Sequence, residues 1–196
     1  RFCFDGMDSI KRLLRKPDDE RLRRTDFGSY PASKFAKDLE NFNAGRPLSE
    51  EQKILISQSY DAVCWLSDHG IKFDPIFERQ SFLKNGRFVF WGGLAVATAD
   101  EGVGLFDQQM KTFNRLGGKI EYGQNVTGLS TKEGVIDGVT INGLTRNADA
   151  VILASGGFEA NEEMRVSFIG ENWRHAKVRG TPYNTGAGLT MAFRLG

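Results

Sequence analysis

Residues 151–161 are the first stretch whose composition points to chemistry, because the apolar run Val-Ile-Leu-Ala is followed directly by Ser155, Gly156 and Gly157. A run that is apolar at every position is typical of a strand buried on both faces of a sheet, and ligands of such sheets bind beyond the carboxyl ends of the strands. Two glycines at that end remove Cβ atoms, so backbone amides can reach a phosphate or an aromatic ring edge. A tight turn with nothing bound explains the pattern equally well.

A second glycine-rich loop spans residues 183–189 and precedes a helical pattern of apolar residues. Thr185 is a suitable N-cap residue, and amides at the start of a helix attract anions. Gly186 and Gly188 form only half of a dinucleotide-binding fingerprint, because no third glycine follows at the required spacing. Residues 102–104 show the same incompleteness, and no strand clearly precedes them.

The composition excludes several classes of protein. The chain has 196 residues, 40% of them apolar and 26% charged, with a formal net charge of +1. These values are typical of a globular domain and provide no electrostatic attraction for nucleic acid. Cys3 and Cys64 lack the spacing of a zinc site or redox pair, so we expect reduced thiols and a cytoplasmic location. We expect no metal site, because the two histidines are far apart, and no membrane insertion, because no long apolar segment occurs.

The elements that must position these loops fall into two parts. Residues 1–98 are predicted to be helical and loop-rich, with one helix over 32–41 and another that begins at the capping box Ser49–Gln52 and ends before Gly70. Residues 71–77 are predicted to be extended, and residues 82–91 to form a strand or hairpin.

Residues 99–196 alternate between helix and strand. The pattern predicts a helix over 103–113, strands over 119–122, 126–131 and 135–141, a turn at Asn142 and Gly143, and the apolar strand 151–154. We therefore expect an α/β fold with α+β character, in which a β-meander is attached to an α/β unit.

This order of elements and glycine loops resembles the middle of the FAD domain of the fumarate reductase and succinate dehydrogenase flavoproteins. The resemblance covers residues 86–196 and is closest to the FAD-dependent tricarballylate dehydrogenases. That closer similarity rests on residues 26–31 (Asp-Phe-Gly-Ser-Tyr-Pro), 86–93 (Gly-Arg-Phe-Val-Phe-Trp-Gly-Gly) and 178–186 (Val-Arg-Gly-Thr-Pro-Tyr-Asn-Thr-Gly).

The resemblance implies FAD as the cofactor and a set of contacts to it. The backbone of Val126 would contact the adenine edge. A turn of small residues would pack on the adenosine half of FAD, namely Ala154, Ser155, Gly156 and Gly157. A second loop, formed by Thr185, Gly186 and Ala187, would also contact the cofactor. One of these positions, Ala187, stands where the family commonly has an aspartate.

The family's Gly-x-Gly-x-x-Gly fingerprint has no counterpart in this chain, and the family's catalytic residues correspond to positions downstream of it. We therefore expect an internal fragment of a flavoprotein, with no catalytic residue assigned here. By itself the segment is expected to bind FAD weakly and to be inactive.

The family-implied reaction is dehydrogenation of tricarballylate or a similar polycarboxylate by hydride transfer to flavin, with an electron acceptor as the second partner. Arg87, Arg179 and His175 are candidates for binding substrate carboxylates. For each of them, a surface side chain packed over an aromatic ring is the favoured interpretation. The alternatives are a fumarate reductase, a ketosteroid dehydrogenase and a non-enzymatic α/β binding module.

The aromatic residues between positions 73 and 91 are expected to belong to the core rather than to a nucleic-acid surface. If other regions of a longer protein cover part of them, the segment alone would expose an apolar patch and self-associate.

Overall fold

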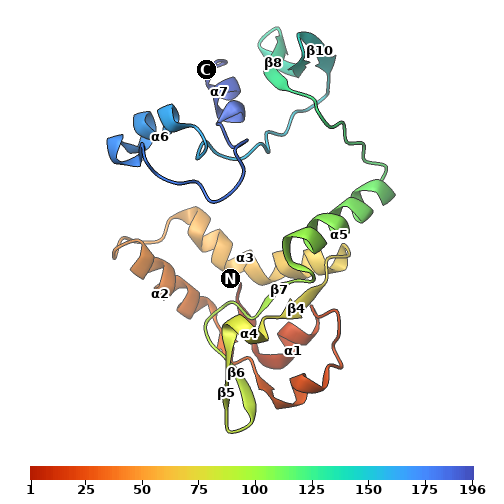
Figure 1. Cartoon of the computed structure of the whole chain (residues 1–196), viewed down its shortest axis with the longest axis vertical. Coiled ribbons are helices and arrows are strands. Elements are labelled where there is room, and N and C mark those ends of the chain that lie inside the picture. The colour runs from red at the N-terminus through yellow and green to blue at the C-terminus, as the bar shows by residue number, and fades with distance from the viewer. The chain divides into compact units, whose positions relative to one another are not determined.

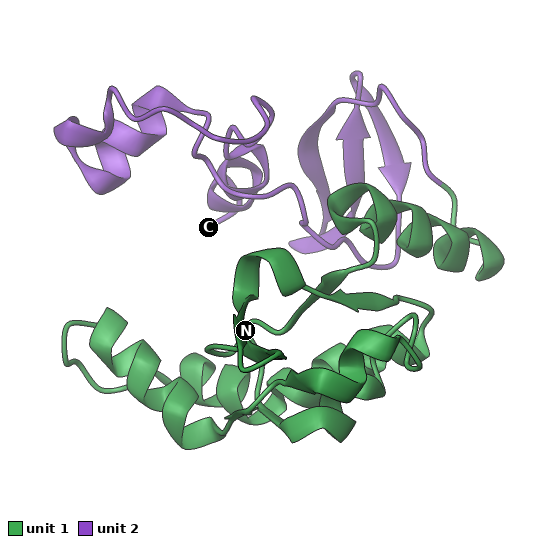
Figure 2. Cartoon of the chain, turned by 60° about the horizontal axis from the view of Figure 1, so that its bottom comes forward, with its two compact units in different colours: residues 1–119 green, residues 120–196 purple.

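The computed structural model describes all 196 residues and divides into two units, residues 1–119 and residues 120–196 (Figure 2). Helices and several small sheets alternate along the chain, which confirms the predicted α/β class. Along the chain, the boundary between the two units falls between Lys119 and Ile120. The functional division after residue 98 that the sequence suggested remains a prediction.

Unit 1 contains five α-helices and one 3-10 helix. They are α1 (Gly6–Lys11), the 3-10 helix Glu20–Arg24, α2 (Ala32–Phe42), α3 (Glu50–Asp68), α4 (Phe77–Gln80) and α5 (Glu101–Arg115) (Figure 1). The capping box at the start of α3 is confirmed, since Ser49 and Gln52 exchange side-chain to backbone hydrogen bonds. The predicted helices over 32–41 and 103–113 are also confirmed as α2 and α5, and both ends of each agree to within two residues.

Short strands connect these helices. β1 (Phe4–Asp5) pairs with β3 (Ser29–Tyr30), and β4 (Phe73–Pro75) pairs with β7 (Val96–Thr98). β5 (Ser81–Lys84) and β6 (Arg87–Phe90) form an antiparallel hairpin, and β2 (Thr25–Asp26) lies parallel to β6. The predicted hairpin over residues 82–91 is therefore confirmed. Its turn, Asn85 and Gly86, has positive φ at both positions, as a tight two-residue connection requires.

The hydrophobic core lies in unit 1. Ile10, Leu13 and Tyr30 are its fully buried side chains, and the aromatic residues Phe73, Phe77 and Phe90 pack with them as expected. The expectation was wrong for two other aromatics, because Phe82 is 51% exposed and Trp91 is 54% exposed. Phe82 belongs to the outer strand of the hairpin, and Trp91 follows the last paired residue of β6.

Unit 2 opens with an antiparallel meander in the order β10-β9-β8. Its strands are β8 (Val126–Lys132), β9 (Val135–Ile141) and β10 (Leu144–Asn147). After the meander come α6 (Glu162–Ile169), the 3-10 helix Glu171–Trp173 and α7 (Ala187–Phe193). The predicted strands 126–131 and 135–141 are confirmed, and residues 144–147 add a third strand.

Two predicted strands are absent. Residues 119–122 and 151–154 form no ladder, and Ile152 is 90% exposed. The last hydrogen bond of the meander runs from the Ala148 amide to the Asp137 carbonyl, and no backbone N–H between residues 149 and 158 donates to the protein. An apolar run becomes a strand only where a second strand pairs with it, and no segment of this chain lies beside residues 151–154 in that way.

No helix combines the length and the apolar character that crossing a membrane would require.

Replacing Ile10 with alanine should lower the free energy of unfolding by about 2–5 kcal/mol, because a fully buried side chain leaves a cavity. The matched control is Ile54→Ala, since Ile54 is 54% exposed and its loss should change that free energy by less than about 0.5 kcal/mol. Urea denaturation followed by circular dichroism measures both variants. Equal destabilisation by the two substitutions would contradict the position of the core.

Candidate functional site

The two glycine loops that the sequence singled out lie together in unit 2. We call residues 155–157 the first turn and residues 184–188 the second turn. The Gly186 amide donates a hydrogen bond of 2.9 Å to the Gly157 carbonyl, and the Ala160 amide donates one of 2.9 Å to the Asn184 carbonyl. The Asn161 side chain adds a third link, because its Nδ2 donates to the Thr185 carbonyl at 3.0 Å. The two turns are therefore a single hydrogen-bonded structure.

The glycines are required by the close packing of the turns. Gly156 and Gly186 have φ values of +79° and +78°, in the left-handed region that favours glycine. A Cβ added to Gly186 would lie 2.5 Å from the Met164 sulfur, and one added to Gly188 would lie 2.5 Å from Ser155 Oγ. The sequence suggested that the glycines make room for a ligand. In the structure, protein atoms from the neighbouring turn and α6 occupy that space.

What the first turn offers to a ligand is its backbone donors. The amides of Ser155, Gly156, Gly157 and Phe158 donate to no protein acceptor. Ser155 and Gly156 are exposed, so their amides are accessible to a ligand. A series of unpaired amides on a left-handed turn is a suitable cradle for anionic or polar oxygen and nitrogen atoms.

The other predicted cofactor residues flank the paired turns. Val126 begins β8, the strand against which α7 packs. Ala154 is exposed immediately before the first turn, and Ala187 is the first residue of α7. The expectation that Thr185 caps this helix was wrong, because α7 begins after Gly186, whose left-handed backbone brings the chain into the helix without a side-chain cap.

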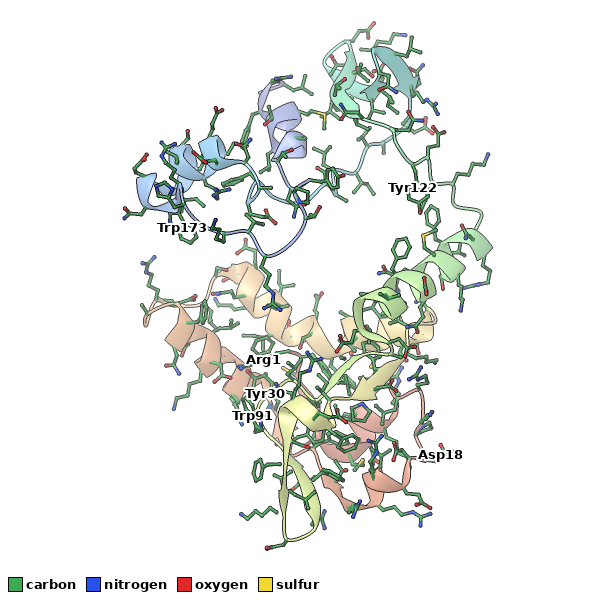
Figure 3. The ribbon with its side chains drawn as sticks, viewed as in Figure 1. Arg1, Asp18, Tyr30, Trp91, Tyr122 and Trp173 are labelled. Atoms are coloured by element: carbon green, nitrogen blue, oxygen red, sulfur yellow. The ribbon has the colours of Figure 1, made fainter.

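A pocket of about 460 Å³ opens beside the first turn, with Gly157, Phe158 and Glu159 in its wall. Of the three candidates for carboxylate binding, only Arg179 lines this pocket. His175 is exposed and is not part of the wall, and Arg87 lies in β6 of unit 1. Trp173, at the end of the 3-10 helix, forms another part of the wall (Figure 3).

A carboxylate reinforces the connection between the turns. Glu159 Oε1 accepts a hydrogen bond of 2.6 Å from Asn184 Nδ2. Hydrogen bonds from its own backbone amide and from Asn184 lower the pKa of Glu159, because they stabilise the ionised form. Sequence reasoning missed this pair, because residues so far apart in the chain give no local signal of contact.

Asn161 was missed as well, although its signal is local. Its side chain accepts a hydrogen bond from the Met164 amide and caps α6. An asparagine followed by two glutamates is a typical helix start.

A model of the flavin-containing amine oxidoreductase family matches residues 5–195. The match covers nearly the whole chain, so the chain belongs to this family. Proteins of the family bind FAD.

The paired turns fit a bound dinucleotide in one specific respect. The amides of residues 155–158 donate to no protein atom, and phosphate, ribose and adenine groups carry acceptors that such amides can bind. That Ser155, Gly156 and Gly157 contact the cofactor remains a prediction, with which these free donors are compatible. When bound, FAD supplies the redox chemistry, and the protein binds and orients it.

Gly186→Ala should lower the free energy of unfolding by about 1–2 kcal/mol from the left-handed backbone alone, and by more where the new methyl group meets Met164. Amide hydrogen exchange of α6 and α7 measures the loss. Gly180→Ala is the matched control, because nothing lies within 4 Å of its added Cβ and its φ is not in the left-handed region. Unchanged exchange in Gly186→Ala would show that the turns are not held together as described.

Asn184→Ala should raise the pKa of Glu159 toward its ordinary value, because the carboxylate loses a donor. The pKa is depressed in the folded state, so the stability that this contact contributes is present above the unfolded pKa and is lost as the pH falls through the folded pKa. Titration of the Glu159 side-chain carbon by NMR gives the value. Asn172→Ala is the control that should leave it unchanged, and a constant pKa in Asn184→Ala would refute the contact.

Proposed function

We propose that the protein takes part in the FAD-dependent dehydrogenation of a polycarboxylate, with tricarballylate or a close analogue as substrate. Three observations from the sequence support this substrate class, namely residues 26–31, 86–93 and 178–186, which resemble the tricarballylate dehydrogenases. In the reaction, a carbon beside a carboxylate loses a hydride to the flavin and its neighbour loses a proton, which leaves an alkene. The electrons then pass to a separate acceptor.

The observation that carries the proposal is the charge of the pocket beside the first turn. Its wall contains three cationic side chains, Arg165, Lys177 and Arg179, and one anionic side chain, Glu159. The excess of positive charge favours an anionic ligand next to the cofactor turn and disfavours a protonated amine. An amine substrate, which the family's description suggests, is therefore the less favoured candidate.

Two of the three remaining alternatives are also flavin-dependent enzymes, and the third is a binding module without a cofactor. A fumarate reductase would act on a dicarboxylate, a ketosteroid dehydrogenase on a neutral apolar substrate, and an α/β binding module on none. We further propose a cytoplasmic location, small-molecule substrates and no nucleic-acid partner, the last because the net charge is close to zero.

Anaerobic mixing of the FAD-loaded full-length protein with tricarballylate should bleach the absorbance of oxidised flavin. Succinate, a 3-ketosteroid and a primary amine are the parallel substrates, and each should bleach it more slowly. Faster bleaching by the amine would overturn the proposed substrate class. A full-length protein that is purified without flavin and takes up none would instead favour the binding module.

A further inference from the structure

The pocket beside the first turn has an apolar body and a buried cation. Six of its wall residues are apolar or aromatic: Phe158, Ile169, Trp173, Ala176, Val178 and Leu189. Its volume of about 460 Å³ lies in the range of small-molecule sites. All of its wall residues belong to unit 2, between Gly157 and Leu189.

Arg165 is the cation, and it is 93% buried, with only 7% of its surface exposed. Its guanidinium donates to three backbone carbonyls. Nη1 donates to Glu159 at 2.5 Å, Nε to Trp173 at 3.1 Å, and Nη2 to Arg174 at 3.2 Å. These bonds use three of the five N–H donors of the side chain.

No carboxylate neutralises this guanidinium. Arg165 forms no ion pair, and no Asp or Glu carboxylate oxygen lies within 4.0 Å of its guanidinium nitrogens. The nearby carboxylates of Glu162 and Glu171 instead bind Arg174, at 2.8 Å and 2.5 Å. The half-buried Arg174 thus has two counter-ions, and the buried Arg165 has none.

A buried charge is unfavourable unless an opposite charge compensates it. Carbonyl dipoles compensate Arg165 only in part. The rest of the wall adds to the imbalance, because Lys177 and Arg179 are also cationic. The single wall carboxylate, Glu159, already accepts a hydrogen bond from Asn184.

We infer that this pocket binds the oxyanion of an organic ligand, a carboxylate or phosphate group carried on a compact apolar or aromatic body. The oxyanion lies toward Arg165, Lys177 and Arg179, and the body of the ligand packs against Trp173 and Phe158. Two sources carry this chemistry, a nucleotide and a polycarboxylate. The inference rests on the same pocket as the proposed function and names the ligand chemistry of that site. Its test measures binding, whereas the test of the proposed function measures flavin reduction.

The test uses the full chain labelled with 5-fluorotryptophan. The chain has three tryptophans, and Trp173→Phe identifies the ¹⁹F signal of the one in the pocket wall. AMP and tricarballylate are added separately, and adenosine serves as the neutral control. At least one anion should shift the Trp173 signal saturably, leave those of Trp65 and Trp91 unchanged, and bind more weakly as salt is added. Saturation by AMP identifies the nucleotide source, and saturation by tricarballylate the polycarboxylate source.

Variants of the pocket rim test the assignment of the charges. Lys177→Gln and Arg179→Gln should each weaken the binding of the saturating anion by up to about fivefold, because both side chains are exposed. Arg194→Gln removes the same charge from an exposed position outside the pocket wall and should leave the affinity unchanged. Arg165→Lys retains the charge but loses the planar fork, and circular dichroism checks that it folds.

Two results would overturn the inference. One is the absence of a saturable Trp173 shift with both anions. The other is equal weakening by Arg179→Gln and Arg194→Gln, which would indicate a response to overall charge and not to the pocket. Both results are read from binding and not from flavin reduction, so a failure of the pocket assignment is distinguished from a failure of the proposed dehydrogenation.

Discussion

The hydrogen bond from the Gly186 amide to the Gly157 carbonyl is the constraint on which the rest of unit 2 depends. It brings together two loops that are widely separated in sequence, and the left-handed backbone at Gly156 and Gly186 allows the approach. The second turn leads directly into α7, and the first leads through Asn161 into α6. The position of both helices, and with them the pocket between residues 157 and 189, therefore follows from how these two turns are paired.

This pairing matters more because unit 2 has little hydrophobic core. Met191 is its one buried hydrophobic side chain, whereas unit 1 has a core of many aromatic and aliphatic residues. Ile152, Phe168 and Phe193 are each more than half exposed. With so little apolar surface removed from water, hydrogen bonds and the carbonyl contacts of Arg165 contribute a larger share of the order in this unit. The expectation that the chain self-associates through exposed apolar surface remains a prediction.

The sequence predicted best those features that a few neighbouring residues determine. The capping box of α3, the hairpin over residues 82–91 and the meander strands depend on interactions between residues close in sequence, so the sequence pattern indicates them. Residues 151–154 were read wrongly for the opposite reason. Their composition is typical of a buried strand, but a strand forms only where another strand pairs with it, and the local sequence does not indicate whether such a partner exists.

The candidate site shows the same division. The first and second turns were recognised from glycine patterns, and the structure brings them together. That the glycines accommodate each other's loops, and that the unpaired amides are the free donors, follows only from the tertiary contacts. Arg165 gave no signal at all, because a mid-helix arginine is ordinarily solvated and only the return of residues 173–174 buries it.

The central claim is that the first turn, held in place by the second, presents free backbone amides to FAD. Amide hydrogen exchange of the full chain with and without FAD tests it most directly. The account predicts that FAD slows exchange at Ser155, Gly156, Gly157 and Phe158, while the β8–β9 turn at Glu133 and Gly134 exchanges as before. Saturable binding of FAD that leaves the exchange of residues 155–158 unchanged would contradict it.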